Sequence, residues 1–590
     1  AGQDLDVAFS VGGSASGGAD YSVLTASPIT IAAGETTADI DLSIVDDALQ
    51  ELPETVILTI DYANSDATEP TAGNTAFTYT ISDDDSIVGA VGPGGVGDAA
   101  SNLLWLRADA ISGVSDGDDL SAWADASGNG HDFAQATAGS QPTYAASAIN
   151  GRPALRFDGD QDFLEDADGE NYINGLDGVS VFAIVLSNEV DSDHGFFDTV
   201  APNNSDDELA IRYDDSGSNS GGDNVVKIGI TAGGNQQQLE SSETIGGVPT
   251  QQSGTAQVLQ ARWASGTDVA FVLNGTEDAN ADLNNPPRSG TFSNATTVLV
   301  GVGPKDQSGG TGWNGDIAEL AVFNSDLNDT RRTLIQNYLA AKYDVTLTGT
   351  DVYAGDTNAN GDYDRGVFGI GAESSSDFHT AAEADGLQFG NPVGLDGGDY
   401  LIAGHKTSDN QVTSQDTPSS VQQRMQRVWF ADVTDGGAGL TADVTFDLSK
   451  AGLSTLAGDA GSYVLLEQSS AGSGSFTQKI TGADAASDDQ ITFNGVSLTD
   501  GSGITLGTTD AVASPISGTA LTITGTAGNE GSASSGTLGG DAGWRMIGPP
   551  VDGATAGDLV SGSDTNGSVV EFGLPVGGMF YRWDDTAGAW

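Results

Sequence analysis

The chain has 590 residues, with 84 Asp and Glu against 19 Lys and Arg, which gives a formal net charge of −65. It contains no cysteine, which excludes disulfide bonds and thiolate zinc sites. Apolar residues make up 38% of the chain, too large a share for a disordered acidic polymer. We therefore expect several folded domains with an acidic surface.

Short alternating runs bounded by Gly, Ser, Thr and Asp occur along the whole chain and predict β-strands. Examples are DLDVAFSV, TVILTI, VSVFAIVL, DVAFVL and ADVTFDL. The exception is segment 328–342, which carries apolar residues at helical spacing, with Asn328 as N-cap and Asp329 in the first turn. We predict an all-β chain of tandem β-sandwich domains with one short amphipathic helix, packed on the outside of a sandwich.

Changes in composition divide the chain. A Gly-rich stretch at 87–101 predicts a linker, and weaker boundaries follow residues 350 and 512. The predicted domains are 1–86, 102–350, 351–512 and 513–590.

Acidic residues in the first domain follow a distinctive pattern: Asp20-Tyr21, then VDDALQELPE at 45–54 and ISDDD at 81–85. This pattern resembles the Calx-beta domain, an immunoglobulin-like sandwich. The resemblance implies that Ca²⁺, which takes six to eight oxygen ligands, is a bound cofactor. The ligands that it implies are Asp20, Asp46, Asp47, Glu51, Glu54, Asp83, Asp84 and Asp85. The alternative is that these are solvated turn residues. The first strand of the family has no counterpart here, so upstream sequence or another chain is expected to supply it.

Residues 102–350 carry LLWLRAD at 103–109, WADASGNGH at 123–131, RPALRFDG at 152–159 and GDIAELAVFN at 315–324. Together these segments resemble the laminin-G or concanavalin-like jelly roll of large bacterial surface proteins. The resemblance implies the fold but no single function, because this fold serves binding, adhesion and catalysis.

Catalysis is not predicted. Glycosidases use paired carboxylates, whereas the acidic run 165–170 is interrupted by Gly169 and is typical of a turn. Sugar binding by Trp123, Trp313 and Asp125 is a second possibility for the jelly roll, with Trp123 and Trp313 as core residues the alternative.

Residues 351–512 continue the resemblance with DRGVFGIG at 364–371 and RVWF at 427–430, similar to strings that follow the jelly roll in bacterial surface proteins of unknown function. Within this part, four residues match the start of an EF-hand loop, but the twelfth position is Val367 instead of Glu. Both a calcium loop and an Asx-rich turn stay open for Asp356, Asn358, Asn360 and Asp364.

The end of the chain resembles a further module. GWRMIGPPV at 543–551 is similar to the opening of a C-terminal β-module in secreted bacterial proteins. The module is expected to be incomplete at Trp590, so the chain is expected to be a section of a larger protein.

The charge has two explanations. Divalent cations bound by clustered carboxylates would neutralise it, and concentrated salt would screen it, because the Debye length falls to about 3 Å at molar ionic strength. Lysine is rare and Asp predominates among the acids, which favours a halophilic source. A calcium-loaded secreted protein is the alternative.

The leading hypothesis is a non-enzymatic, extracellular bacterial surface protein, adhesin-like or fibre-forming, with calcium-stabilised domains. Expected partners are other copies of the chain, through end-to-end or strand-addition assembly, or a surface glycan or protein receptor. Nucleic acid is excluded as a partner because no basic patch is visible, and no run is long enough to span a membrane. The alternative hypothesis is a carbohydrate-binding or glycoside-hydrolase-related protein that uses the jelly roll. A spacer without a ligand is a third.

Overall fold

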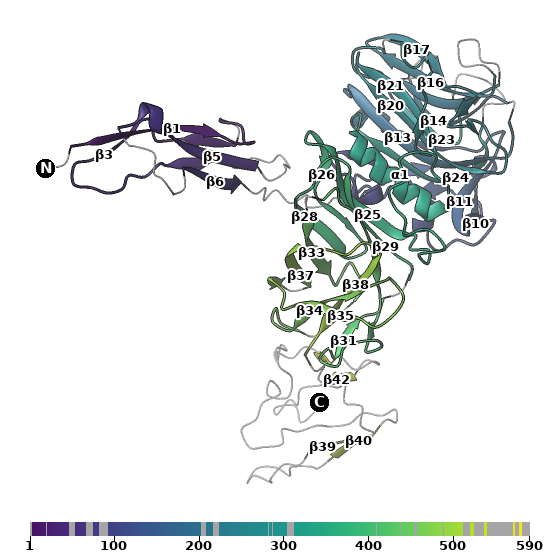
Figure 1. Cartoon of the computed structure of the whole chain (residues 1–590). Helices are drawn as coiled ribbons and strands as arrows, with labels where there is room; N and C mark the ends of the chain where they lie inside the picture. The colour runs from purple at the N-terminus through teal and green to yellow at the C-terminus, as the bar shows by residue number, and fades with distance from the viewer. Residues whose placement is uncertain are drawn as a thin grey trace, which may run out of the picture. The chain divides into compact units, whose positions relative to one another are not determined.

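The computed structural model describes residues 3–510 except 19, 46–53, 67–74, 82–91, 191, 202–207, 216–222, 281, 286, 304–311, 409, 438, 454–455, 457 and 488, together with four short strands between residues 520 and 580. Strands dominate these residues, with one α-helix among them (Figure 1). The predicted all-β class is therefore confirmed. Residues 1–509 form one compact unit and residues 510–590 another.

The first domain contains two small antiparallel sheets. One has the strand order β3-β1-β5-β6, and β2 pairs with β4 in the other. Tyr21 and Val56 are buried between them, and Val11, Leu42 and Ile81 pack against these two residues. The strands are β1 (Leu5–Gly12), β2 (Tyr21–Val23), β3 (Ile29–Ile31), β4 (Leu42–Ile44), β5 (Glu54–Asp61) and β6 (Ala76–Ile81).

The second domain is a sandwich of two eight-stranded sheets. The first sheet runs β10 (Thr143–Ile149), β11 (Arg152–Asp158), β24 (Asn314–Phe323), β13 (Gly178–Ser187), β20 (Ala256–Ala264), β21 (Asp268–Leu273) and β22 (Thr276–Glu277), with β7 (Asn102–Arg107) also paired to β24. The second runs β17 (Asn235–Glu240), β16 (Val225–Ala232), β15 (Leu209–Asp214), β14 (His194–Val200), β23 (Thr297–Val300), β12 (Leu164–Asp166), β9 (Phe133–Ala134) and β8 (Ala122–Trp123). A hairpin of β18 (Thr244–Ile245) and β19 (Val248–Pro249) completes it.

Strand β13 is buried on both faces, which explains its continuous apolar sequence. Side chains alternate across a strand, so Val181 and Val185 enter the core between the two sheets. Phe182 and Ile184 enter a second core on the other face. The first sheet therefore needs a cover on its outer face.

The third domain is a second sandwich. Its larger sheet runs β26 (Asp377–His379), β25 (Arg365–Ser374), β29 (Asp399–His405), β32 (Trp429–Thr434), β38 (Ser502–Thr508), β31 (Gln423–Met425) and β30 (Val412–Thr413), with β34 (Tyr463–Gln468) on β38 and β35 (Thr477–Thr481) on β34. Its smaller sheet runs β27 (Ala382–Ala384), β28 (Leu387–Val393), β33 (Thr441–Asp447), β37 (Gln490–Val496) and β36 (Ala485–Ser487).

The helix α1 (Asp329–Tyr343) provides the cover, and 12 of its 15 residues are buried. The predicted N-cap is confirmed, since the Asn328 side chain accepts a hydrogen bond from the Arg331 N–H. From the third domain, the Asp377 carboxylate accepts from the N–H groups of Asp329 and Thr330, at 3.0 Å each. A carboxylate at this end is favoured by the helix dipole.

The helix packs on the outside of the second-domain sandwich, as predicted, but its other side is not exposed. Its buried residues share one hydrophobic core with Phe182 of β13 and with Tyr400 and Phe430 of the third domain. The helix therefore covers one sandwich and joins it to another.

Part of the predicted linker is also packed. The short 3-10 helix η2 (Pro93–Gly95) is buried and contacts α1, β25 and β27. A Cβ on Gly94 would lie 2.8 Å from the Leu334 carbonyl oxygen, and one on Gly95 would lie 2.7 Å from the Ala382 Cβ. Glycine is required here because only a bare backbone fits. The other 3-10 helices are η1 (Tyr62–Asn64), η3 (Ala108–Ala110), η4 (Ala138–Ser140) and η5 (Gly169–Asn171).

In the second unit, residues 510–590, the described residues after Asp510 form two strand pairs. β39 (Ala520–Ile523) pairs with β40 (Gly536–Gly539), and β41 (Val570–Phe572) pairs with β42 (Gly578–Phe580). Among the described residues of the chain, no helix has the length and apolar character needed to cross a bilayer.

Substitution Gly94→Ala should destabilise the joined sandwiches by about 2–4 kcal/mol, because it adds a backbone clash to the strain of a positive φ. Gly113→Ala is the matched control: Gly113 has a similar φ of 77° but open space around its Cβ position, so it should cost only about 1–2 kcal/mol. Urea denaturation measures both. Equal costs would contradict the packed role of η2.

Candidate functional site

A cavity of about 510 Å³ lies where the first sheet of the second domain, α1, η2 and the third domain meet. Six of the 19 Lys and Arg residues of the chain line this junction cavity, against four acidic residues and one histidine. With the histidine neutral, six basic against four acidic side chains leave the lining with a net charge of +2. The sign of the charge is thus reversed locally in a strongly acidic protein. The basic residues are Arg107, Arg152, Lys342, Arg365, Arg427 and Lys450, and the acidic residues are Asp109, Asp364, Glu383 and Asp385.

Glu319 of β24 is buried directly behind the cavity and organises its base. Its carboxylate accepts four hydrogen bonds, so the cost of burying the charge is offset. The donors are Trp105 Nε1 at 2.7 Å, Lys342 Nζ at 2.8 Å, Tyr338 Oη at 2.9 Å and Tyr343 Oη at 3.0 Å. Burial and the Glu319 charge raise the pKa of both tyrosines well above the ordinary value, so both hydroxyls stay protonated and donate.

Asp109 connects this base to the cavity. Arg107 donates to both of its oxygens at 3.1 Å, and Lys342 Nζ lies 3.0 Å from Oδ2. Burial acts to raise the pKa of Asp109, but Lys342 and Arg107 outweigh it and hold that pKa well below its usual range. Asp109 is therefore a carboxylate at any pH near neutrality.

His405 and Asp385 form a pair in the part of the cavity that the third domain contributes. His405 Nε2 lies 2.7 Å from Asp385 Oδ2. Burial lowers the pKa of His405, and the hydrogen bond from His405 lowers the pKa of Asp385, so the pair is a neutral imidazole that donates to a carboxylate. Gly366 makes room for it, because a Cβ there would lie 2.6 Å from Asp385 Oδ2.

Two arginines in the cavity keep unused donors. The Arg365 guanidinium forms no hydrogen bond or ion pair with the described residues. Arg427 is 6% exposed and donates to the carbonyl oxygens of Asp385, at 2.6 Å, and Ser408, at 3.3 Å. Its Nε is buried and has no partner among the described residues. Burial lowers the pKa of Arg427, which reflects a charged group with too little solvation.

A second cavity of about 360 Å³ adjoins the first, and Ser408, Arg427 and Lys450 line both. Asn410 and Gln411 add amide groups to the second cavity. The two cavities form one polar path along the third domain.

The predicted calcium ligands of the first domain fall largely outside the described residues. This holds for Asp46, Asp47, Glu51, Asp83, Asp84 and Asp85, and for the side chain of Glu54. Asp20 is described: it is 7% exposed, and its carboxylate accepts a hydrogen bond from the Ser16 N–H. Calcium binding there stays a prediction.

The predicted aromatic platform in the second domain is wrong. Trp123 and Trp313 are fully buried in the core between the two sheets, so neither ring can stack on a sugar. Asp125 instead holds a loop together, since its carboxylate accepts from the N–H groups of Trp105, Ser127, Gly130 and His131.

The EF-hand-like segment forms a turn before β25. Asn358 and Asn360 are exposed, and Asn360 Nδ2 donates to the Ala354 carbonyl oxygen at 2.7 Å. The Asp364 side chain contacts the second domain instead of the turn, because its Oδ2 accepts a hydrogen bond from Arg152 Nη2 at 2.7 Å. Burial and then Asp351 raise the pKa of Asp356 to about 7. These contacts favour the Asx-rich turn, and calcium binding there stays a prediction.

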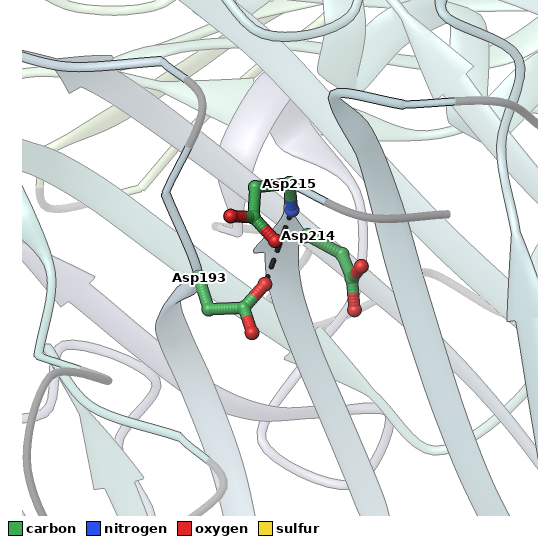
Figure 2. Close-up of side chains that lie close together, drawn as sticks. All are labelled: Asp193, Asp214 and Asp215. Carbon is green, nitrogen blue, oxygen red and sulfur yellow. Dashed lines mark hydrogen bonds between the residues drawn. The ribbon is translucent and has the colours of Figure 1, made fainter. Parts of the chain in front are cut away.

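Figure 2 shows three further acids that lie close enough for one cation: Asp193, Asp214 and Asp215. The Asp215 N–H donates to Asp193 Oδ1 at 3.1 Å. Asp214 is already paired with Lys227 Nζ at 2.6 Å and Arg212 Nη2 at 3.1 Å. Two cations therefore neutralise the buried member of this group, and we assign no metal to it.

Sequence reasoning missed the junction cavity. Arg152 and Asp364 meet although 212 residues separate them, and no local motif signals such a contact. The composition gave one signal. Because basic residues are rare in this chain, an arginine near a domain boundary is a candidate for a site residue.

The comparisons with known proteins match only part of the chain. One family model, described as Domain of unknown function (DUF8202), matches residues 389–502. This segment lies inside the third domain. No curated protein matches the chain.

Several solved structures are similar over part of the chain. A Trypanosoma rangeli sialidase in complex with the inhibitor DANA is 13% identical with a TM-score of 0.26, over 40% of this chain and 32% of its own. A SAP-like pentraxin from Limulus polyphemus is 14% identical with a TM-score of 0.25, over 33% of this chain and 84% of its own. The CBM40 of a Ruminococcus gnavus sialidase, bound to α2,3-sialyllactose, is 13% identical with a TM-score of 0.21, over 27% and 81%. This chain thus covers about a third of the sialidase, and none of these similarities bears on its activity.

The lowered pKa of Asp109 predicts acid sensitivity. A carboxylate with a depressed folded-state pKa stabilises the fold above the unfolded pKa of about 4, and this contribution is lost as the pH falls toward the folded pKa. Asp109→Asn should be less stable than the parent at pH 6, and the difference should shrink between pH 4 and pH 2. Thermal unfolding across this range measures it, with the exposed Asp362→Asn as control. A constant difference would contradict the ion-pair role.

Proposed function

We propose that this chain is a non-enzymatic recognition section of an extracellular bacterial surface protein, and that its junction cavity binds an anionic ligand. One observation carries the proposal: nearly a third of the basic residues of a chain with net charge −65 line a single cavity. Burying like charges together is unfavourable unless something compensates them. Four lining acids and Glu319, which holds Lys342 from behind, compensate most of this charge, and an anion would compensate the rest.

The arrangement favours binding over catalysis. Each acid of the cavity has a basic partner or histidine: Asp109 with Arg107, Asp364 with Arg152, Glu383 with Lys450 and Asp385 with His405. A general acid needs a raised pKa, whereas the pKa of Asp109 and that of Asp385 are lowered. These carboxylates are suited to hold cations and accept hydrogen bonds.

A halophilic source, which we also propose, would favour such a site. Molar salt screens charges that solvent surrounds, but charges enclosed in a cavity are screened much less. A site whose basic groups are partly buried retains more selectivity for anions than an exposed basic patch.

Self-assembly is the second part of the proposal. Among the described residues, β6 is the edge strand of its sheet, and Phe77 and Tyr79 on it are 61% and 44% exposed. An edge strand with exposed aromatic residues is open to strand addition. We propose that another copy or an upstream segment pairs with this domain, and that Ca²⁺ at the acids between Asp20 and Asp85 stiffens it.

Anion binding predicts that sulfate, phosphate or galacturonate will bind the full chain in isothermal titration calorimetry, whereas neutral galactose will bind more weakly. Arg365→Gln should weaken the anion at least tenfold, because charged hydrogen bonds contribute about 1.5–3 kcal/mol. Arg288→Gln removes the same charge from an exposed position outside the cavity and should bind like the parent. Absence of binding by every anion, or equal affinity of the two variants, would contradict the proposal.

Calcium and salt make a separate prediction. Adding a chelator should lower the melting temperature of the first domain, and returning Ca²⁺ should restore it, because a ligand bound only to the folded state stabilises it. Lowering NaCl should lower the melting temperatures of all domains. Calorimetry at low and high NaCl separates the two effects. A chelator without effect at either salt concentration would rule out calcium, and equal stability at both would rule out the halophilic source.

A further inference from the structure

The lining of the junction cavity brings together the unused donors of Arg365 and two carboxylates that each have an uncommitted oxygen. Asp364 precedes Arg365 in the chain and is held by Arg152 through Oδ2 alone. Asp385 lies against Gly366, which follows Arg365, and is held by His405 through Oδ2 alone. For both acids, Oδ1 has no hydrogen-bond partner among the described residues. The Asp364 carboxylate is partly exposed and that of Asp385 is half-exposed, so both are accessible from the cavity.

We propose that the ligand is a polyhydroxylated carboxylate, an acidic saccharide of the uronic acid type, whose carboxylate binds Arg365 and Arg427 and whose hydroxyl groups donate to Asp364 and Asp385. This proposal rests on anion binding in the junction cavity and names the class of anion. Its basis is the juxtaposition of free cationic donors with free carboxylate acceptors. Neither set alone would specify such a ligand.

The acceptors argue against a fully deprotonated inorganic anion such as sulfate. Carboxylates can only accept hydrogen bonds, and sulfate has no proton to donate. A sulfate ion near Arg365 would meet Asp364 and Asp385 with their oxygens facing its own. A sugar acid avoids this conflict, because its hydroxyl groups donate to the two carboxylates while its single carboxylate binds the guanidinium groups.

The net charge argues against a zwitterion. An amino acid offers an ammonium group to the carboxylates and a carboxylate to the arginines, but it adds no net charge. With His405 neutral, the lining and the Glu319 carboxylate behind it together carry a net charge of +1, and an amino acid with an uncharged side chain leaves this excess in place. A ligand with net negative charge and neutral donors reduces it.

The adjoining cavity indicates that the saccharide has more than one unit. Arg427 and Lys450 line both cavities, and Gln411 lines the second with an exposed amide. The two cavities measure about 510 and 360 Å³, and together they lie within the range usual for a drug-sized ligand. A chain of acidic sugar units could place one carboxylate on Arg365 and Arg427 and a second near Lys450.

The test is isothermal titration calorimetry on the full chain, with galacturonate, trigalacturonate, galactose, serine and sodium sulfate as probes at a fixed NaCl concentration. We expect galacturonate to bind at least tenfold more tightly than sulfate, serine or galactose, and trigalacturonate more tightly than galacturonate. Gln411→Ala should reduce the advantage of trigalacturonate and leave galacturonate unchanged.

Asp385→Asn tests the acceptor role. The asparagine oxygen can still accept from His405, so the pair is kept, while the amide replaces the free acceptor with a donor. Galacturonate affinity should fall about tenfold and sulfate affinity should not fall. Asp362→Asn, an exposed change outside the cavity lining, is the control, and melting temperatures confirm that both variants fold.

The outcomes separate this inference from the proposed function. Sulfate that binds as tightly as galacturonate, or an Asp385→Asn variant that keeps full galacturonate affinity, overturns the saccharide assignment but leaves anion binding intact. Tightest binding by serine assigns the site to an amino acid and also overturns the saccharide assignment. If no anion binds, anion recognition itself is wrong.

Discussion

The structure depends on one buried carboxylate. Glu319 accepts hydrogen bonds from β7 and from three positions on α1, so it fixes the helix on the outer face of the first sheet of the second domain. A buried charge that lost any of these donors would be strongly destabilising. Because α1 is held there, its other side is available to the third domain. The junction cavity exists because two sandwiches share this helix.

Acidic and basic residues are distributed differently in this molecule. Acidic residues dominate the chain as a whole, while a large share of the few basic residues is enclosed at the junction. Some of these cations have structural partners: Lys342 holds α1 on the second domain through Glu319, and Arg152 joins the second and third domains through Asp364. Arg365 and Arg427 have donors that the described residues do not use. Arg427 also has a structural role, because it donates to the carbonyl oxygens of Asp385 and Ser408, whereas the proposed ligand would give the Arg365 guanidinium a partner.

The helix shows which structural features could be predicted from the sequence and which could not. Its position and its N-cap at Asn328 were predictable because they depend on spacing and on residues three positions apart. Its burial was not. Gln336 and Asn337 make the helix look solvent-facing, yet both are buried, with Gln336 bonded to Gln260 and Asn337 to the Thr350 carbonyl oxygen. Polar residues satisfied by distant partners give no local sign of burial.

By itself, the sequence determined the all-β class, the helix and the turns, because alternation and capping act over a few residues. The tertiary structure alone decided that Trp123 and Trp313 belong to the core, that a glycine-rich segment is packed, and that scattered basic residues converge on one cavity. The contact between Arg152 and Asp364 spans 212 residues. Such contacts follow from how two sandwiches pack on α1, and packing between domains leaves no periodic trace in the chain.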